Sequence, residues 1–150
     1  MGKKNISWGD VEEYLKRYIG DIVLVSDTEE AIHIDKDFPD EFKGSKDTKK
    51  VKGANAKAKA NSVQGIREMI HISKKVLQME NLKEKNVKKA QQGWYRYLTR
   101  FALPALTEDN VILHYNVYLA TLIVRVDKAR ILHLYDVINV KKESTVPFAL

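Results

Sequence analysis

The chain has 150 residues, of which 44% are hydrophobic and 31% charged, and its formal net charge is +6. That length and apolar content favour one globular domain over residues 1–150. Without cysteine the chain can form neither a disulfide framework nor a thiolate metal site. No apolar run approaches the roughly 20 residues of a membrane span. No hydrophobic segment follows the basic residues 1–5, so we expect a cytoplasmic protein without a secretory signal or a membrane partner.

The positive charge is unevenly distributed along the chain. Residues 43–59 contain seven lysines and a single acidic residue, Asp47, whereas the first forty residues are acidic by contrast. A basic surface favours anionic partners, mainly nucleic acid or an acidic protein. Modest positive charge also serves solubility, so charge alone leaves both interpretations open.

The N-terminal part predicts a helix, a hairpin and a helical turn. Ser7 fits an N-cap, and apolar side chains recur at helical spacing over residues 8–19, where Gly20 ends the helix. Residues 21–25 and 31–34 are short β-rich runs around a turn and predict a small hairpin. Residues 38–42 begin a helical turn, since proline is tolerated at the first helical position. We treat residues 1–35 as an extension of a core formed by residues 36–150.

A helical pattern follows the lysine-rich segment, from Ala54 to Leu77. Its apolar stripe consists of Ala56, Ala60, Val63, Ile66 or Arg67, Ile70, Ser73 and Leu77. The opposite side carries Lys57, Asn61, Gln64, Glu68 and His71. Gly65 costs about 1 kcal/mol inside a helix relative to alanine, so it marks either close packing or a break. Residues 81–90 are polar and predict a short helix or an ordered loop.

Three strand-like segments end the chain. Residues 94–103 are aromatic and β-rich, and Pro104 ends their ladder. Residues 111–126 predict one long strand, or two joined by a bulge, and residues 131–140 predict the last strand. The connections are short, so these strands are antiparallel neighbours. Helices followed by a strand meander predict an α+β domain with a three- to four-stranded antiparallel sheet.

The alternation of side chains assigns faces to these strands. The predicted core face consists of Tyr118, Ala120, Leu122 and Val124 in the middle strand, and of Leu132, Leu134, Ile138 and Val140 in the last. Asp136 lies among the latter and needs a partner if it is buried. In the first strand, either the set beginning with Trp94 and Arg96 or the set beginning with Tyr95 and Tyr97 faces inward. The first set contains two arginines, which indicates that this set faces the solvent.

If the outward sets align, one sheet face combines cations with an aromatic ring: Arg96, Arg100, Arg125, Tyr135 and Lys141. Arginine offers planar donors that suit phosphate, and tyrosine offers a plane on which an unpaired base can stack. Arginines and aromatics also pair across the strands of any exposed sheet. A purely structural role for these residues therefore stays open.

No motif for metal or cofactor binding is present. The chain lacks a glycine-rich phosphate loop, a paired-histidine metal motif and a carboxylate cluster, so we expect no metal and no cofactor. A metal-free ribonuclease needs a base, an acid and fixed cations around the phosphate. Of the four histidines, His71 shares the polar side of its helix with Asn61 and Gln64, which makes it the candidate for proton transfer.

Several segments together resemble a domain of large polyvalent proteins from phages and conjugative elements of Firmicutes. That domain is assigned to the barnase–EndoU–colicin–RelE nuclease fold. The segments are Phe38-Pro39-Asp40-Glu41-Phe42, Lys57-Ala58-Lys59-Ala60-Asn61, Gly93-Trp94-Tyr95-Arg96-Tyr97 with residues 100–104, Tyr115-Asn116-Val117, and residues 134–137 running to 141–143. The resemblance implies helices before a four-stranded antiparallel sheet, in a family of mostly metal-independent ribonucleases. Many of its members are toxins, and several have lost activity.

The resemblance and the residues together favour a nucleic-acid-directed protein of a mobile element, with RNA as partner and metal-independent endoribonuclease chemistry. The alternative is a degenerate accessory domain that binds a protein or nucleic acid, because Asn86 and Lys89 replace a histidine and an aspartate of the family pattern. A protein partner or inhibitor over the basic face is also considered. The catalytic candidates are Arg96, Tyr97, Arg125, Tyr135 and His71. The candidates for nucleic-acid binding are Lys57, Lys59, Asn61, Arg100, Lys141 and Lys142.

Overall fold

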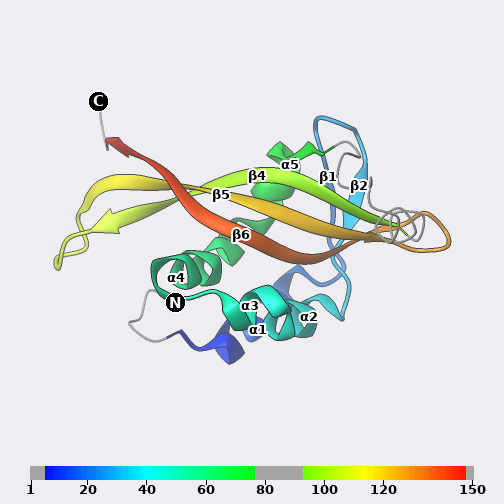
Figure 1. The fold of residues 1–150 in the computed structure, drawn as a ribbon, viewed down its shortest axis with the longest axis horizontal. Helices are drawn as coiled ribbons and strands as arrows, with labels where there is room; N and C mark the ends of the chain where they lie inside the picture. Colours follow the sequence, from blue (N-terminus) through cyan, green and yellow to red (C-terminus); the bar gives the residue numbers. More distant parts are fainter. Residues whose placement is uncertain (1–5, 77–92, 148–150) are drawn as a thin grey trace.

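A computed structural model describes residues 6–76 and 93–147 (Figure 1). Its helices are α1 (Trp8–Leu15), α2 (Phe38–Gly44), α3 (Lys46–Lys50), α4 (Gly53–Ser62) and α5 (Ile66–Ile72), with 3₁₀ turns η1 (Lys16–Tyr18) and η2 (Val63–Gly65). Its strands are β1 (Ile22–Leu24), β2 (Ala31–His33), β3 (Lys74–Lys75), β4 (Trp94–Leu106), β5 (Ile112–Val126) and β6 (Leu132–Pro147). The predicted α+β class is confirmed. The prediction for residues 81–90, with Asn86 and Lys89, lies outside the described residues.

The sheet differs from the predicted one. It has six strands in the order β1-β2-β6-β5-β4-β3, and it is mixed because β2 runs parallel to β6. The predicted three- to four-stranded antiparallel sheet is therefore wrong, although β4, β5 and β6 are antiparallel neighbours. The predicted hairpin forms, but its second strand pairs with β6 at Leu132 and His133 and joins the main sheet. Strands this short carry too little alternation to reveal a distant pairing partner.

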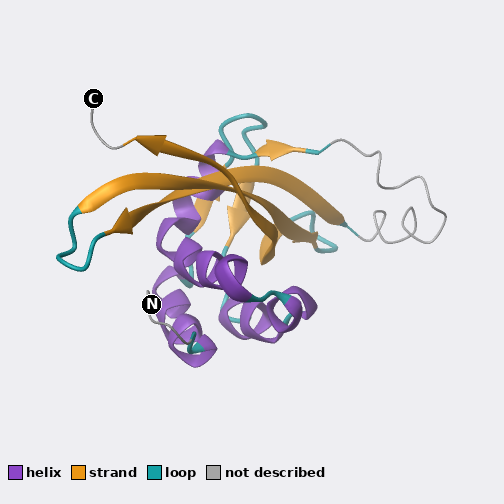
Figure 2. Ribbon diagram, turned by 60° about the vertical axis from the view of Figure 1, so that its left-hand side comes forward, coloured by secondary structure: helices purple, strands orange, loops and turns teal. Residues whose placement is uncertain are grey.

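The helices cover one face of the sheet (Figure 2). We call this the inner face, and the core lies between it and the helices. Phe38 and Phe42 of α2, Ile66 of α5 and Leu122 and Leu134 of the sheet are fully buried there. No helix in the described ranges is long and apolar enough to span a membrane. The long strands project past the helices at the end where β4 turns into β5 (Figure 1).

The register of the long strands settles which side chains face the core. Tyr97 lies opposite Leu122, Thr99 opposite Ala120, and Phe101 opposite Tyr118. Tyr97, Leu122 and Ala120 are buried, so the set of β4 with Tyr95 and Tyr97 faces inward and the set with Trp94 and Arg96 faces outward. The core face predicted for β5 is confirmed. In β6, the register shift between Leu134 and Asp136 turns Val137 into the core, and Ile138 is only half-buried.

Two strands are longer than predicted. β4 continues through Pro104 to Leu106, and β6 continues to Pro147. The β4–β5 register runs without interruption from Trp94 to Ala105. Proline is tolerated in an edge strand where its missing N–H would face away from the paired strand. Pro104 therefore leaves the ladder to β5 intact.

The helical segment after Gly53 is broken rather than continuous. η2 separates α4 from α5. Gly65 lies at this junction, and its backbone is not helical, with φ −117° and ψ 25°. A Cβ at Gly65 would meet only the tip of Glu68, at 3.9 Å, so the glycine marks a break and not close packing. The predicted apolar stripe is otherwise buried at Ala56, Val63 and Ile70.

Gly93 fixes the start of β4. Its φ is +92°, and an added Cβ would lie 2.3 Å from the Cβ of Val126. Its carbonyl accepts a hydrogen bond from the Val126 N–H at 2.5 Å. Only glycine combines this backbone conformation with this close approach.

Candidate nucleic-acid interface on the open sheet face

None of the described helices covers the outward side of the long strands (Figure 2). We call it the open face, and its side chains come from three strands: Trp94, Arg96, Leu98 and Arg100 of β4, Leu119, Thr121, Ile123 and Arg125 of β5, and His133, Tyr135 and Lys141 of β6. All five residues for which the sequence predicted a shared face belong to it. In β4 and β5 their common side follows from the period of two. In β6, where the register shifts, Tyr135 is placed by its ring contact with Trp94 and Lys141 by its pairing with Leu119.

The cations of the open face differ in their partners. Arg96 is exposed and lies diagonally across from Arg125, because Arg96 pairs with Ile123; such diagonal residues are roughly 7–8 Å apart. Arg100 has an ion pair with Glu143 at 3.2 Å, and both side chains remain solvent-exposed. Neither Arg96 nor Arg125 forms an ion pair with another residue of the described ranges. The charge of Arg125 does act on Glu41 of α2, where it opposes the rise in the pKa of that carboxyl. Outside ion pairs, the guanidinium groups of Arg96 and Arg125 can each still bind a phosphate.

Arg100 and Lys141 flank Leu119, which pairs with both of them. Two strand spacings therefore separate them, roughly 10 Å. They border a hollow of about 860 Å³ that also includes Lys74. Its apolar floor contains Leu98 and Ile72, which are 54% and 50% exposed. An apolar floor between cations suits a ligand that is flat and apolar at one end and anionic at the other.

An aromatic pair lies beside the arginines. The rings of Trp94 and Tyr135 meet edge to face, with centroids 5.2 Å apart and an interplanar angle of 82°. Trp94 comes from β4 and Tyr135 from β6, so the pair spans the intervening strand β5. Both side chains are half-buried and keep part of their ring surface accessible. Such rings provide stacking planes for unpaired bases.

A row of polar residues crosses four strands at the same end of the sheet. Trp94 pairs with Arg125, Arg125 with His133, and His133 with His33 of β2. The two imidazole centroids are 6.0 Å apart. Neither histidine was among the site residues predicted from the sequence. Alternation places His133 on the face of Tyr135, but the pairing of β2 with β6, which brings in His33, had no sequence signal.

His133 is held between two carboxylates. Its Nε2 lies 2.7 Å from Oδ2 of Asp127, and its Nδ1 lies 2.6 Å from Oδ2 of Asp35, although the second contact lacks hydrogen-bond geometry. The hydrogen bond from His133 is the main reason why the pKa of the Asp127 carboxyl is lowered. These contacts fix the orientation of the His133 ring between Arg125 and His33.

Tyr97 does not belong to the site. Its side chain is fully buried on the inner face, and its hydroxyl donates a hydrogen bond to Oε1 of Glu30 at 2.6 Å. Burial and this hydrogen bond both raise the pKa of the Tyr97 hydroxyl. The predicted role in base stacking or proton donation is therefore wrong for Tyr97, because a base cannot reach it without opening the core. Of the two tyrosines predicted for the site, Tyr135 is the one on the open face.

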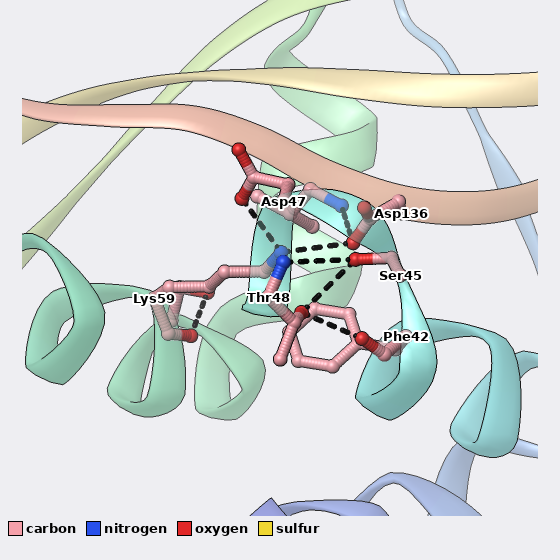
Figure 3. Close-up of polar contacts among 8 residues, drawn as sticks. Phe42, Ser45, Asp47, Thr48, Lys59 and Asp136 are labelled. Carbon is pink, nitrogen blue, oxygen red and sulfur yellow. Dashed lines mark hydrogen bonds and ion pairs between the residues drawn. The ribbon is translucent and has the colours of Figure 1, made fainter. Parts of the chain in front are cut away.

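Lys59 is also a core residue rather than a nucleic-acid ligand. Its Nζ lies 2.8 Å from Oδ2 of Asp47 and 3.1 Å from Oδ1 of Asp136, and its side chain has no exposed surface (Figure 3). The ammonium also lies 4.9 Å from the ring centroid of Phe42. Burial raises the pKa of Asp136, and the charge of Lys59 opposes that shift. The partner that a buried Asp136 was predicted to need is thus Lys59.

The remaining candidates lie elsewhere on the surface. Lys57, Asn61 and Arg100 line a groove of about 960 Å³ on the helical side of β4. Lys142 is exposed and pairs with Tyr118, an inner-face position. His71 lies at the end of α5, where its Nδ1 is 3.0 Å from the carbonyl of Leu24. His71 is therefore not grouped with the open-face arginines, and the predicted catalytic set does not converge.

Comparison with known proteins adds no constraint. No protein-family model, curated protein or solved structure matches the chain. The resemblance to the polyvalent-protein domain therefore stays an expectation from sequence.

Proposed function

We propose that the protein binds single-stranded RNA across the open face of its sheet. The observation that supports this most directly is the gathering of Arg96, Arg100, Arg125 and Lys141 on the sheet face that no described helix covers, beside the Trp94–Tyr135 pair. Arginine donates two parallel hydrogen bonds to a phosphate, and aromatic rings stack on bases that are not paired. Binding by both means requires a single strand, since the bases of a duplex are stacked on each other.

The hollow between Arg100 and Lys141 extends this arrangement along the sheet. Its apolar floor suits a base, and its bordering cations suit the adjoining phosphate. The strand would then run from the hollow past Arg96 to the Trp94–Tyr135 pair and Arg125. Such contacts release counterions, so affinity falls with salt.

The test compares two variants that each lose two positive charges. Arg96→Ala with Arg125→Ala removes open-face arginines, whereas Lys49→Ala with Lys50→Ala removes exposed lysines of α3. Fluorescence anisotropy with a labelled single-stranded RNA, repeated over a series of salt concentrations, gives affinity and salt slope. We expect the arginine variant alone to lose affinity and to lower the log–log slope by about 1.4, at about 0.7 for each phosphate contact. Equal losses in both variants, or a slope near zero for the parent protein, would contradict the proposal.

A second candidate function is metal-independent cleavage of the bound RNA. The row of Arg125, His133 and His33 favours it, because it sets two imidazoles beside a phosphate-binding cation. In such a reaction a base removes the proton of the 2′-hydroxyl, the 2′-oxygen attacks phosphorus, and an acid protonates the departing 5′-oxygen. Arg125 would stabilise the charge on the phosphate.

Incubation of total RNA and a defined tRNA with the protein in EDTA tests this second candidate. Discrete cleavage that is lost in Arg125→Ala and His33→Ala, but kept in His71→Ala, supports it. Intact RNA together with salt-sensitive binding would exclude cleavage and leave the binding function standing.

A further inference from the structure

A second surface lies on the other side of β4, between that strand and the helices α4 and α5. This groove of about 960 Å³ is lined by every residue from Arg100 to Leu106. Alternate residues of a strand point to opposite faces, so a groove that meets all of them follows the edge of the strand. Lys57 and Glu68 form the helical wall. We call this surface the edge groove.

Within residues 6–76 and 93–147, no strand pairs with β4 along the edge groove. β3 pairs only with Tyr97 and Leu98. The N–H of Val76 donates to the carbonyl of Arg96, so the polar backbone groups of Arg96 face this edge. Alternation then turns Arg100, Ala102 and Pro104 to the same side. Arg100 and Ala102 present both N–H and C=O there, and Pro104 presents its C=O. An unpaired edge of this kind is a template for another strand.

The other edge of the sheet is built differently. β2 pairs with β6 only at Leu132 and His133, so the later part of β6 is also an edge. It carries Asn139 with a φ of 55°, register shifts, and the charged run Lys141-Lys142-Glu143. Irregular backbone and charge discourage the addition of strands. Residues 101–106 of β4 contain no charge and keep a regular register as far as Ala105.

The walls of the edge groove indicate what would fill it. The rings of Phe101 and Tyr118 stack with centroids 5.3 Å apart, and Leu103 and Met69 extend the apolar floor. At the rim, Lys57 is exposed on α4, and Arg100 adds a second cation against the single acid Glu68. Apolar side chains therefore fit the floor, and a carboxylate fits the rim beside Lys57. Unpaired amides with an apolar floor match a polypeptide better than a nucleic acid.

We propose that an extended segment of a partner protein adds to the edge of β4 as a strand, opposite Arg100 to Pro104. Main-chain hydrogen bonds to Arg100 and Ala102 hold it, as in other cases of strand addition. Its alternate apolar side chains enter the edge groove, and an acidic side chain reaches Lys57. This site lies on the opposite side of β4 from the proposed RNA-binding face and shares only Arg100 with it.

The probe is a synthetic peptide of about seven residues, close to the common length of a strand, in which valine alternates with threonine and one end carries glutamate. Two substitutions at Ala102 separate the contribution of the backbone N–H to binding from that of the side chain. Ala102→Pro removes the N–H at the edge, while Ala102→Val keeps it. Titrations followed by NMR report binding through the amides of Arg100 and Ala102. We expect the parent protein and Ala102→Val to bind, and Ala102→Pro to lose at least tenfold in affinity.

Two further measurements keep the test decisive. A peptide N-methylated at alternate amides should not bind the parent protein, which tests the hydrogen bonds even if Ala102→Pro does not fold. Lys57→Ala should lower the affinity for the glutamate peptide several-fold. Its affinity for a peptide with glutamine in place of glutamate should match that of the parent protein. Absence of binding by the parent protein, or equal binding by Ala102→Pro and by the methylated peptide, would overturn the proposal. RNA affinity should be unaltered in Ala102→Pro, so a failure here is distinct from a failure of the RNA-binding function.

Discussion

The two faces of the long strands are made from neighbouring residues and yet have opposite environments. Arg96 is exposed on the open face, and Tyr97, the next residue, is fully buried and bonded to Glu30. The helix α4 repeats this contrast, since Lys57 lies at the surface and Lys59 lies in the core between two carboxylates. The inner face therefore carries the stability of the fold, and the open face is the surface for which we propose RNA binding. Substitutions on the two faces test this division. A substitution on the inner face should lower stability, and a substitution on the open face should lower RNA affinity.

The largest expected effect is on the inner face, at Asp136. Asp136→Ala leaves Lys59 buried with Asp47 as its remaining ion-pair partner among the described residues. Removing one partner of a buried ion pair costs about 3–5 kcal/mol, because the remaining charge stays desolvated. Urea denaturation should report this loss of unfolding free energy. Glu143→Ala, which removes an exposed carboxylate from the same strand, serves as control and should stay close to the parent protein.

A smaller but pH-dependent effect is expected at Tyr97. Burial raises the pKa of Glu30, but hydrogen bonds from Tyr97, Lys75 and Thr28 outweigh it, so the pKa of Glu30 lies below its usual 4.5. A carboxyl with a lowered pKa in the folded state stabilises the fold above its unfolded pKa, and this stability is lost as pH falls through the folded pKa. Tyr97→Phe removes one of these hydrogen bonds to a charged group, at a cost of about 1.5–3 kcal/mol.

Denaturation of Tyr97→Phe at pH 7 and at several values below pH 4.5 tests the linkage. The difference from the parent protein should be largest at pH 7 and should narrow as Glu30 becomes protonated. Tyr135→Phe on the open face is the matched control. A difference that does not change with pH would mean that Tyr97 stabilises the fold by packing alone.

Alternation predicted the faces of the long strands because each strand repeats it many times. Tyr118, Ala120, Leu122 and Val124 carry the pattern through four successive inward positions, and all are buried. The same reasoning predicted that Asp136 needs a partner but could not identify Lys59, because the depth of a lysine depends on where its helix packs. In a run of seven lysines, Lys59 has no local signal that separates it from Lys57.

The parts of the sheet and site that were missed depend on contacts between distant segments. β1, β2 and β3 have two or three residues each, too few for a periodic pattern to select a partner. The parallel pairing of β2 with β6 sets His33 beside His133. The two carboxylates around His133 come from Asp35, just after β2, and from Asp127, at the start of the β5–β6 turn. Such a row is visible only once the strands are arranged in space.

The smallest expected effect on stability is on the open face. Arg96→Ala with Arg125→Ala removes two cations that have no ion pair with another residue of the described ranges, so unfolding free energy should change by less than about 0.5 kcal/mol for each. The same double variant is expected to lose RNA affinity. Thermal denaturation measured beside RNA binding separates the two outcomes. If the double variant proved unstable, the arginines would contribute to cross-strand packing, and a loss of RNA affinity would no longer distinguish the ligand-binding face from the structural one.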